Sequence, residues 1–475
     1  MEAPDLEGSM ISYNAFVTGL HRVLSSDADL NAHPLEQILQ GISTVDQLEK
    51  IPEGTVVLVR CDLDVPLEDS KVADSSRIEA TLATLQYGIQ HGWKMVLLGH
   101  LGRDPKGSVM PVCKAMSIAL EHPIEFVSKW LDVDNMRLLD QAVSAVKASA
   151  PGSIFMFENT RQYDIETALW SATDANFDGV AQNMYTLAKD FRERLSDIEV
   201  NEALAASNAD FSSCVLPLAM SQTALGFYVS TEMKDHIAGA RRANFVVVSG
   251  AKLTKLSDLE AILERNCVRW IISGGAFAMA LKKAQAQIEG GDFFLGRVER
   301  DPKAKGFVSS KDLDLAKRIV TRCREKEIEL TLPIDFVLDT GEVAEQIPPE
   351  RAQFDIGPKT RDLLSRQLVD YVSLSKKSSV PFTMFFNGAF GKFEDSKFAD
   401  GTKDFVSRLR GLTQSGIKTY VGGGEGRMAL ARFGSVSDVT HAFTAGVTIL
   451  KSLSDNHVHF LKAMYLNNSE SENHQ

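Results

Sequence analysis

The sequence predicts an α/β fold with two doubly wound parallel-sheet lobes joined by a hinge. The chain has 475 residues, enough for two substantial hydrophobic cores and too many for one. Short, continuously apolar runs recur along it, and helical patterns separate these runs. Because strands that are buried on both faces are apolar throughout, this alternation indicates parallel sheets that are covered by helices on both sides.

The expected elements alternate in chain order. The clearest strands are expected at 55–59, 95–98, 154–157, 245–248, 270–272 and 384–386. The clearest helical patterns lie at 77–91, 258–266, 310–326 and 360–372. The division between the lobes is expected near 219–242, because a Ser/Thr-rich segment with a glycine leads there into a helix-like stretch, after which the pattern restarts.

Four parts of the chain follow from this division. Residues 1–40 form a polar, weakly patterned extension that is a helix or largely disordered. Residues 41–225 form the first lobe and 226–450 the second. The C-terminal segment 451–475 is expected to return to the first lobe and to end in a frayed tail.

Composition and charge narrow the classes of function. The chain is 44% hydrophobic and 24% charged, as is ordinary for globular proteins, and no apolar run approaches the roughly 20 residues of a membrane span. The acidic start, with no basic or arginine-rich segment, and five widely spaced cysteines without a Cys-x-x-Cys pair favour a reducing, cytoplasmic location. A net charge of -12 argues against nucleic acid. We expect a monomer without nucleic-acid or membrane partners.

Cationic residues follow three expected strands of the first lobe. They lie in Arg60–Pro66, Gly99–Arg103 and Glu158–Arg161, and Arg77 lies at the start of a helix. Ligands of parallel sheets bind beyond the carboxyl ends of the strands, and guanidinium groups pair with carboxylates and phosphates. The pattern therefore favours a site for a small phosphorylated acid. Each arginine alone is also explained by an ion pair with a neighbouring carboxylate.

Glycine-rich loops follow the expected strands of the second lobe. They are Ser249–Lys252, Ser273–Ala276, Asn387–Gly391 and Gly422–Gly426. Glycines allow backbone N–H groups and helix N-termini to approach phosphates, and Lys252 adds a positive charge. These loops favour a nucleotide site, although each alone is also explained as a plain strand-to-helix turn. The fingerprints of P-loop and Rossmann proteins are absent from the sequence.

Taken in order, these motifs resemble those of the phosphoglycerate kinase family. The likeness extends from about residue 43 to about residue 464, and its most specific segments are 60–66, 99–103, 158–161, 355–360, 387–394 and 422–424. The resemblance implies phosphoryl transfer between ATP and 3-phosphoglycerate. It also implies an acid site in the first lobe, a nucleotide site in the second and closure of the hinge between them.

The resemblance implies roles for individual residues. The acid site would include Asp62, Asp64, Arg77, His100, Arg103 and Arg161. The catalytic residues would be Arg77, which stabilises the transferring group, and Lys252, which contacts it. The nucleotide site would include Gly250, Lys252, Gly274, Gly275, Phe354, Asn387, Glu394, Gly422, Gly423, Gly424 and Glu425. Glu425 would also be linked to the Mg²⁺ that accompanies ATP or ADP.

Several acid-site positions depart from the family pattern. Asp64 replaces an asparagine and adds a negative charge to a pocket for an anion. Asn208 and Ala209 stand where an arginine and a histidine are expected. Since a hydrogen bond to a charged group contributes about 1.5 to 3 kcal/mol, these changes should weaken acid binding on the order of a hundredfold.

Further departures lie in the second lobe. Leu256 replaces a second lysine, and the adjacent Lys255 should point to another side of its helix. Glu425 replaces an aspartate, and Gly426 a hydroxyl residue. A run of three glycines appears as Ala445-Gly446-Val447, where the branched valine should obstruct the approach of backbone to phosphates.

Three functions stay open from the sequence. The first is a working kinase for ATP and 3-phosphoglycerate. The second is a catalytically silent relative that keeps the fold and nucleotide binding, with a structural, scaffolding or regulatory role and a protein partner at surfaces such as residues 1–40. The third is a kinase for another acid, which the changes at Asp64 and Ala209 would permit.

Overall fold

The computed structural model divides the chain into two compact units. The first contains Met1–Asp235 and Asn456–Gln475, and the second contains His236–Asp455. The structure describes residues 11–25, 30, 32–48, 51–102, 104–444, 449, 452–453 and 457–472. Among the described residues, no helix is both long enough and apolar enough to cross a membrane.

The first unit is built on a seven-stranded, wholly parallel sheet in the order β1-β11-β10-β2-β5-β9-β6. Its strands are β1 (Ser43–Thr44), β2 (Val56–Cys61), β5 (Lys94–Leu98), β6 (Ile124–Val127), β9 (Ile154–Phe157), β10 (Ile198–Glu202) and β11 (Gln222–Leu225). In register, Val59 pairs with Leu97 and Leu97 with Met156. The carboxyl ends of β2, β5 and β9 therefore lie side by side.

Helices cover both faces of this sheet. Alternate residues of one strand enter different cores: Leu58 packs in one hydrophobic cluster, and Val57 and Val59 pack in another. The covering helices include α4 (Ser76–Gln90), α5 (Met110–Leu120), α6 (Asp140–Ala148), α7 (Phe177–Arg194), α8 (Leu216–Ala219) and α9 (Phe227–Thr231). Two hairpins, β3–β4 (Leu67–Glu68, Lys71–Val72) and β7–β8 (Leu131–Asp132, Arg137–Leu138), complete the described strands of this unit.

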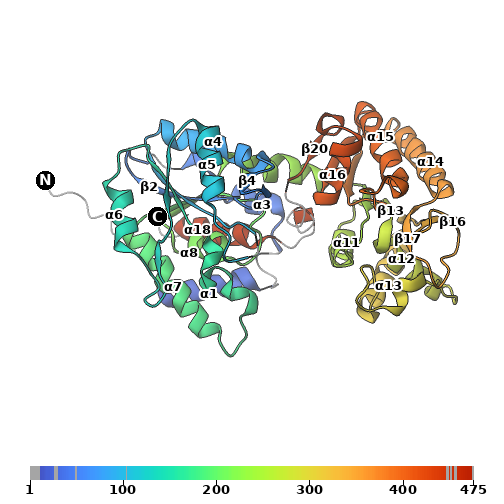
Figure 1. Cartoon of the computed structure of the whole chain (residues 1–475), viewed down its shortest axis with the longest axis horizontal. Helices are drawn as coiled ribbons and strands as arrows, with labels where there is room; N and C mark the ends of the chain where they lie inside the picture. The colour runs from blue at the N-terminus through green and yellow to red at the C-terminus, as the bar shows by residue number, and fades with distance from the viewer. Residues whose placement is uncertain are drawn as a thin grey trace. The chain divides into compact units, whose positions relative to one another are not determined.

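Both ends of the chain contribute helices to the first unit. Helix α1 (Tyr13–Leu24) begins at Ser12, whose Oγ accepts a hydrogen bond from the Ala15 N–H. Its apolar side is buried in the unit's core, and α3 (Leu35–Gln40) follows it. Helix α18 (His459–Glu472) packs against α1 and α8 (Figure 1). The extension at 1–40 is therefore helical over much of its described length.

The second unit contains a six-stranded parallel sheet in the order β14-β13-β12-β18-β19-β20. Its strands are β12 (Phe245–Val248), β13 (Trp270–Ser273), β14 (Glu329–Thr331), β18 (Thr383–Asn387), β19 (Lys418–Gly422) and β20 (His441–Ala442). Its helices include α10 (Ala238–Ala240), α11 (Lys255–Glu264), α12 (Gly275–Ile288), α13 (Ser310–Glu325), α14 (Pro358–Ser375), α15 (Asp400–Gln414) and α16 (Gly424–Phe433). The predicted fold class, with two parallel sheets, is confirmed.

A small antiparallel sheet in the second unit was not anticipated. Its strands are β15 (Phe336–Leu338), β16 (Val343–Ala344) and β17 (Gln353–Ile356), in the order β16-β15-β17. Each is four residues or fewer, which is too short for a clear periodicity in the sequence.

A buried carboxyl group ties β10 to two helices. Glu202 is 0% exposed and accepts hydrogen bonds from Thr84 Oγ1 of α4 at 2.6 Å and from the Tyr228 and Val229 N–H groups of α9 at 3.1 Å. Burial raises the pKa of Glu202 to about 7. The folded protein therefore binds a proton at Glu202 that the unfolded chain releases near an ordinary glutamate pKa.

Replacement of Glu202 by glutamine should remove this pH dependence. Because the pKa of Glu202 is raised in the folded state, the stabilisation from its protonation is complete below the unfolded-state pKa. That stabilisation is lost as the pH rises towards 7. The unfolding free energy of the wild type minus that of Glu202→Gln should fall by about 2 kcal/mol between roughly pH 5 and pH 7.5. Urea unfolding of both proteins at several pH values measures this difference in unfolding free energy. A difference that is constant with pH would contradict the assignment.

Candidate functional site

Five of the predicted acid-site residues lie at neighbouring strand ends of the first unit. Asp62 and Asp64 follow β2, His100 follows β5, Arg161 follows β9, and Arg77 is in the first turn of α4. The parallel register brings these ends together. Arg103, the sixth residue, lies outside the described residues.

Arg77 is paired with two carboxyl-bearing residues. Its Nη1 donates to Asp62 Oδ1 at 2.9 Å and to the Asp64 backbone carbonyl at 2.8 Å. Asp64 Oδ1 in turn accepts a hydrogen bond from the Gly102 N–H at 2.8 Å. Burial raises the pKa of Asp62, and the charge of Arg77 opposes this shift. An incoming anion must therefore share Arg77 with carboxylates of the protein.

A buried arginine sets the protonation state of His100. Arg60 is 1% exposed, and its Nη2 lies 2.9 Å from His100 Nδ1. Because a guanidinium can only donate, Nδ1 accepts and the ring proton lies on Nε2. Burial, followed by the positive charges of Arg60, Arg161 and Arg77, lowers the pKa of His100 well below its usual value. His100 is thus a neutral hydrogen-bond donor.

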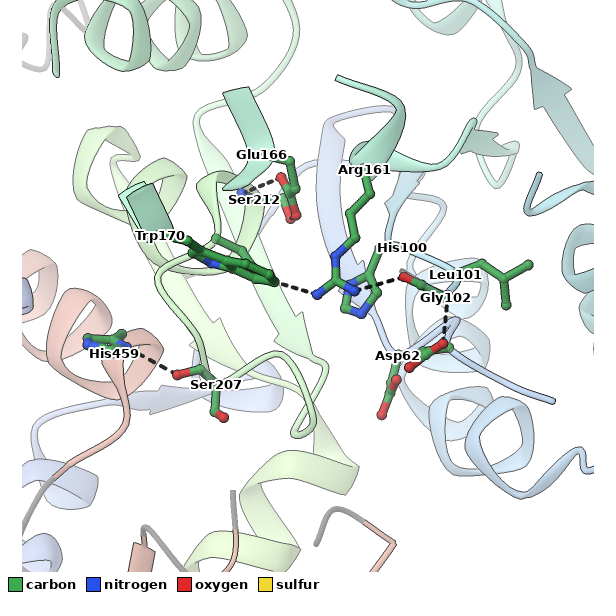
Figure 2. Close-up of polar contacts among 12 residues, drawn as sticks. Asp62, His100, Leu101, Gly102, Arg161, Glu166, Trp170, Ser207, Ser212 and His459 are labelled. Atoms are coloured by element: carbon green, nitrogen blue, oxygen red, sulfur yellow. Dashed lines mark hydrogen bonds and ion pairs between the residues drawn. The ribbon is translucent and has the colours of Figure 1, made fainter. Parts of the chain in front are cut away.

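Arg161 is held on several sides. Its Nη1 donates to the Gly102 carbonyl at 2.8 Å, and its guanidinium carbon lies 5.0 Å from the centre of the Trp170 ring. Figure 2 shows Arg161 extending between the Trp170 indole and the Gly102 carbonyl, with the His100 ring beside it. Its Nη2 also lies 4.0 Å from Asp210 Oδ2.

Two buried carboxyl groups share this region. Glu166 accepts hydrogen bonds from the Ser212 hydroxyl at 2.6 Å and the Ser212 N–H at 3.1 Å, and Asp210 accepts one from Trp170 Nε1 at 3.0 Å. Burial and then the charge of Asp210 raise the pKa of Glu166 to about 7. Burial also raises the pKa of Asp210, while Arg60 and Arg161 oppose that shift.

The arrangement does not fit a metal ion. His100, Glu166 and Asp210 offer ligand atoms within 4.8 Å of one another among the described residues. However, Arg60 already donates to His100 Nδ1, and both Arg60 and Arg161 would repel a dication.

The sequence analysis missed three members of this site, Glu166, Trp170 and Asp210, and gave Arg60 no individual role. Arg60 was counted among the cations that follow the strands, and Asp210 follows directly after Ala209. Glu166 and Trp170 lie in the helix η3 (Asp164–Ser171), where they carry no motif of their own. Their roles depend on contacts with residues distant in sequence.

A cavity of about 320 Å³ opens at the strand ends of the second unit. Five predicted nucleotide-site residues line it: Gly250, Gly275, Phe354, Glu394 and Glu425. Three cations that the prediction missed also line it, namely Arg297, Lys305 and Lys392. The Lys392 amine lies 3.4 Å from the centre of the Phe354 ring. The cavity therefore combines an aromatic face with positive charge.

Two glycines are required by the close approach of the loops after β12 and β13. Gly250 has φ of +109° and Gly275 has φ of +64°, in the region that favours glycine. A Cβ at Gly275 would lie 2.7 Å from the Gly250 carbonyl oxygen, and one at Gly250 would lie 2.4 Å from Glu425 Oε2. A side chain at Gly275 would collide with backbone, whereas at Gly250 it would be disfavoured chiefly by the positive φ.

Lys255 corrects an expectation drawn from the sequence. We expected it to point away from the site, but its amine donates to the Ser249 carbonyl at 3.0 Å and lies 3.7 Å from Glu425 Oε2. Leu256 instead turns into the core and is 0% exposed. The first residue of α11, closest to the loop, is thus the one that faces the strand ends. Burial lowers the pKa of Lys255, while Glu425 opposes the shift.

The remaining predicted residues lie outside the cavity lining. Lys252 is exposed in the loop after β12. Asn387 ends β18, is 1% exposed, and neither of its side-chain polar atoms has a hydrogen-bond partner. The other members, Gly274, Gly422, Gly423 and Gly424, lie at the ends of β13 and β19. Residues 445–447, where we expected steric obstruction, lie outside the described residues.

Comparisons with known proteins agree in one family. A family model described as phosphoglycerate kinase matches residues 46–456. The chain is 30% identical over 421 residues to phosphoglycerate kinase of Finegoldia magna, covering 84% of this chain and 94% of that one. It is 27% identical over 417 residues to phosphoglycerate kinase of Candida glabrata, covering 84% and 92%.

Solved structures show the same fold. Phosphoglycerate kinase from Coxiella burnetii matches with a TM-score of 0.66 and 24% identity, covering 89% of this chain and 98% of that one. The enzyme from Pyrococcus horikoshii matches with a TM-score of 0.68 and 22% identity, covering 90% and 100%.

The His100 ring should stay neutral over the physiological pH range. Nitrogen-detected NMR of labelled protein should show His100 as the neutral Nε2–H tautomer throughout the physiological pH range, because burial and the nearby arginines lower its pKa. Arg60→Met, which removes the donor to Nδ1, should release this tautomer. An ordinary titration near pH 6.5 in the wild type would refute the assignment.

Proposed function

The chain belongs to the phosphoglycerate kinase family, and from that premise we propose that it binds magnesium with ATP or ADP in the cavity of its second unit and transfers phosphate to 3-phosphoglycerate weakly or not at all. The observation that carries the proposal is a contrast between the units. The second has an open cavity whose lining includes Lys305 and Lys392 as well as Glu394 and Glu425, whereas in the first unit the arginines face carboxylates of the protein directly.

The residues of the second unit fit a nucleotide with magnesium. Glu425 Oε2 is buried without a hydrogen-bond partner and has only the Lys255 amine beside it, at 3.7 Å, so this oxygen could serve as a ligand for magnesium. Gly250 and Gly275 let the backbone reach the cavity, and the Phe354 ring offers an apolar surface beside it. When bound, magnesium neutralises charge on the nucleotide phosphates. Lys255 would add a positive charge at the same edge, and Lys252, exposed nearby, would reach the transferring group.

The acid site supports only weak binding. Its described members include three guanidinium groups, from Arg60, Arg77 and Arg161. Four carboxyl groups face them, from Asp62, Asp64, Glu166 and Asp210, and His100 is neutral. Positive charge is thus balanced within the protein. A phosphorylated acid must displace these partners or accept a site with little net attraction.

A working kinase is the second candidate, and Lys255 favours it. The family's second lysine is absent at Leu256, but the Lys255 amine lies at the loop carbonyl of Ser249. A cation is therefore kept at this edge of the sheet from a position one residue earlier. With that charge retained, the second unit would still support transfer.

The hypothesis of a catalytically silent relative also included a protein partner that binds at residues 1–40. The apolar side of α1, with Phe16, Leu20 and Val23, is buried within the first unit. A partner that binds at α1 would therefore contact the polar side of this helix.

Nucleotide binding should depend on the cavity residues. Isothermal titration calorimetry with ADP and magnesium should detect binding by the wild type, and Phe354→Ala and Lys255→Ala should each weaken it about tenfold, because they remove ring contact and charge. Lys376→Ala, which removes an exposed lysine at the end of α14, is the matched control and should bind like the wild type. Absence of ADP binding by the wild type would overturn the proposal.

Turnover distinguishes the two candidates. A coupled assay with ATP, magnesium and 3-phosphoglycerate should show little or no turnover if the acid site is self-neutralised. Robust turnover that Lys252→Ala abolishes would establish the working kinase and reject the first proposal. Residual turnover that survives Lys252→Ala would be assigned to contamination, since Lys252 is the proposed contact of the transferring group.

A further inference from the structure

We propose that Asp210 is an internal counter-anion of Arg161, a specificity-determining residue that lowers the affinity of the first unit for small phosphorylated acids. This inference rests on the acid site of the proposed function and names the residue that restrains it. It does not depend on whether the second unit binds a nucleotide.

Position and burial carry the first step. Asp210 lies directly before η4 (Phe211–Val215) and is 0% exposed, and its Oδ2 lies 4.0 Å from Arg161 Nη2. The carboxylate is thus on the protein side of the guanidinium, where solvent does not screen their attraction.

Unsatisfied hydrogen-bonding groups carry the second step. Asp210 Oδ2 and Arg161 Nε are both buried without a hydrogen-bond partner, whereas Asp210 Oδ1 accepts from Trp170 Nε1. Buried polar atoms without a hydrogen-bond partner are uncommon, because the missing hydrogen bond costs free energy. For Asp210 Oδ2, the ion pair with Arg161 Nη2 at 4.0 Å is therefore the interaction that compensates for the missing hydrogen bond.

The surroundings of Arg161 carry the third step. Trp170 covers the guanidinium at 5.0 Å and also orients Asp210 through its indole N–H, and the Gly102 carbonyl takes Arg161 Nη1. Trp170 and the Gly102 carbonyl thus hold the guanidinium from two sides (Figure 2), and Asp210 Oδ2 lies 4.0 Å from its Nη2. An external phosphate or carboxylate would meet an arginine whose charge is already compensated.

The other charged groups nearby do not replace Asp210. Glu166 lies 3.8 Å from Arg60 Nη2 and accepts two hydrogen bonds from Ser212, so it serves the neighbouring arginine. Asp62 is paired with Arg77. Among the described carboxylates that form ion pairs here, Asp210 is the one assigned to Arg161.

The decisive experiment measures the affinity for 3-phosphoglycerate in the full chain. Calorimetry at fixed low ionic strength should show that Asp210→Asn and Asp210→Ala bind 3-phosphoglycerate about tenfold or more tightly than the wild type, because Arg161 then lacks its internal anion. Asp174→Asn removes an exposed carboxylate of the same unit and should change the affinity less than about twofold.

A double variant separates this role from a purely structural one. In an Arg161→Met background, Asp210→Asn should give no gain in affinity, since the gain is transmitted through Arg161. The increase in melting temperature on addition of 3-phosphoglycerate should also be larger for Asp210→Asn than for the wild type, which reports binding even if the variant is less stable.

The outcomes are distinct. An Asp210→Asn variant that binds 3-phosphoglycerate no more tightly than the wild type, or a gain that persists with Arg161→Met, overturns the inference. ADP binding, measured on the same samples, should be unchanged by Asp210→Asn. Loss of ADP binding in all samples would reject nucleotide binding in the second unit, and the acid-affinity comparison would still decide the role of Asp210.

Discussion

Both candidate sites depend on one constraint, which is that neighbouring strands of each main sheet run parallel. Parallel strands end at the same edge, so residues that follow β2, β5 and β9 meet although long stretches of chain separate them. The same holds for the loops after β12, β13 and β18. Helices on both faces bury the strands and leave that edge as the place for polar side chains.

The two edges use polar groups differently. In the first unit, Arg60 and Arg77 donate hydrogen bonds to carboxyl, hydroxyl and imidazole groups of the same unit. In the second unit, Glu425 and Asn387 retain polar atoms without partners. Arginines that already face carboxylates have little remaining attraction for an anion, whereas the amide of Asn387, which lacks hydrogen-bond partners, can gain from a ligand. In the first unit, Asp210 Oδ2 and Arg161 Nε also lack hydrogen-bond partners.

The sequence predicted the fold and the location of both edges, because apolar runs such as 154–157 and 245–248 are continuous and therefore unambiguous. It did not predict the direction of Lys255, since helix α11 begins at that residue and the loop before it sets its orientation. Nor did it predict the pairing of Asp210 with Arg161, which joins segments 49 positions apart through a contact that no local period encodes.

The position of α18 has a consequence for how the protein is made. This helix carries Ala463 and Leu466 into the same core as α1, yet all of His236–Asp455 is synthesised before it. The segments that form the first unit's sheet therefore emerge from the ribosome long before helix α18, which completes the core of that unit, has been synthesised. Until the last residues emerge, the nascent first unit exposes apolar surface to chaperones, whereas the second unit is already fully synthesised. Translation of the first unit thus begins before that of the second, but the second unit is the first to be completed.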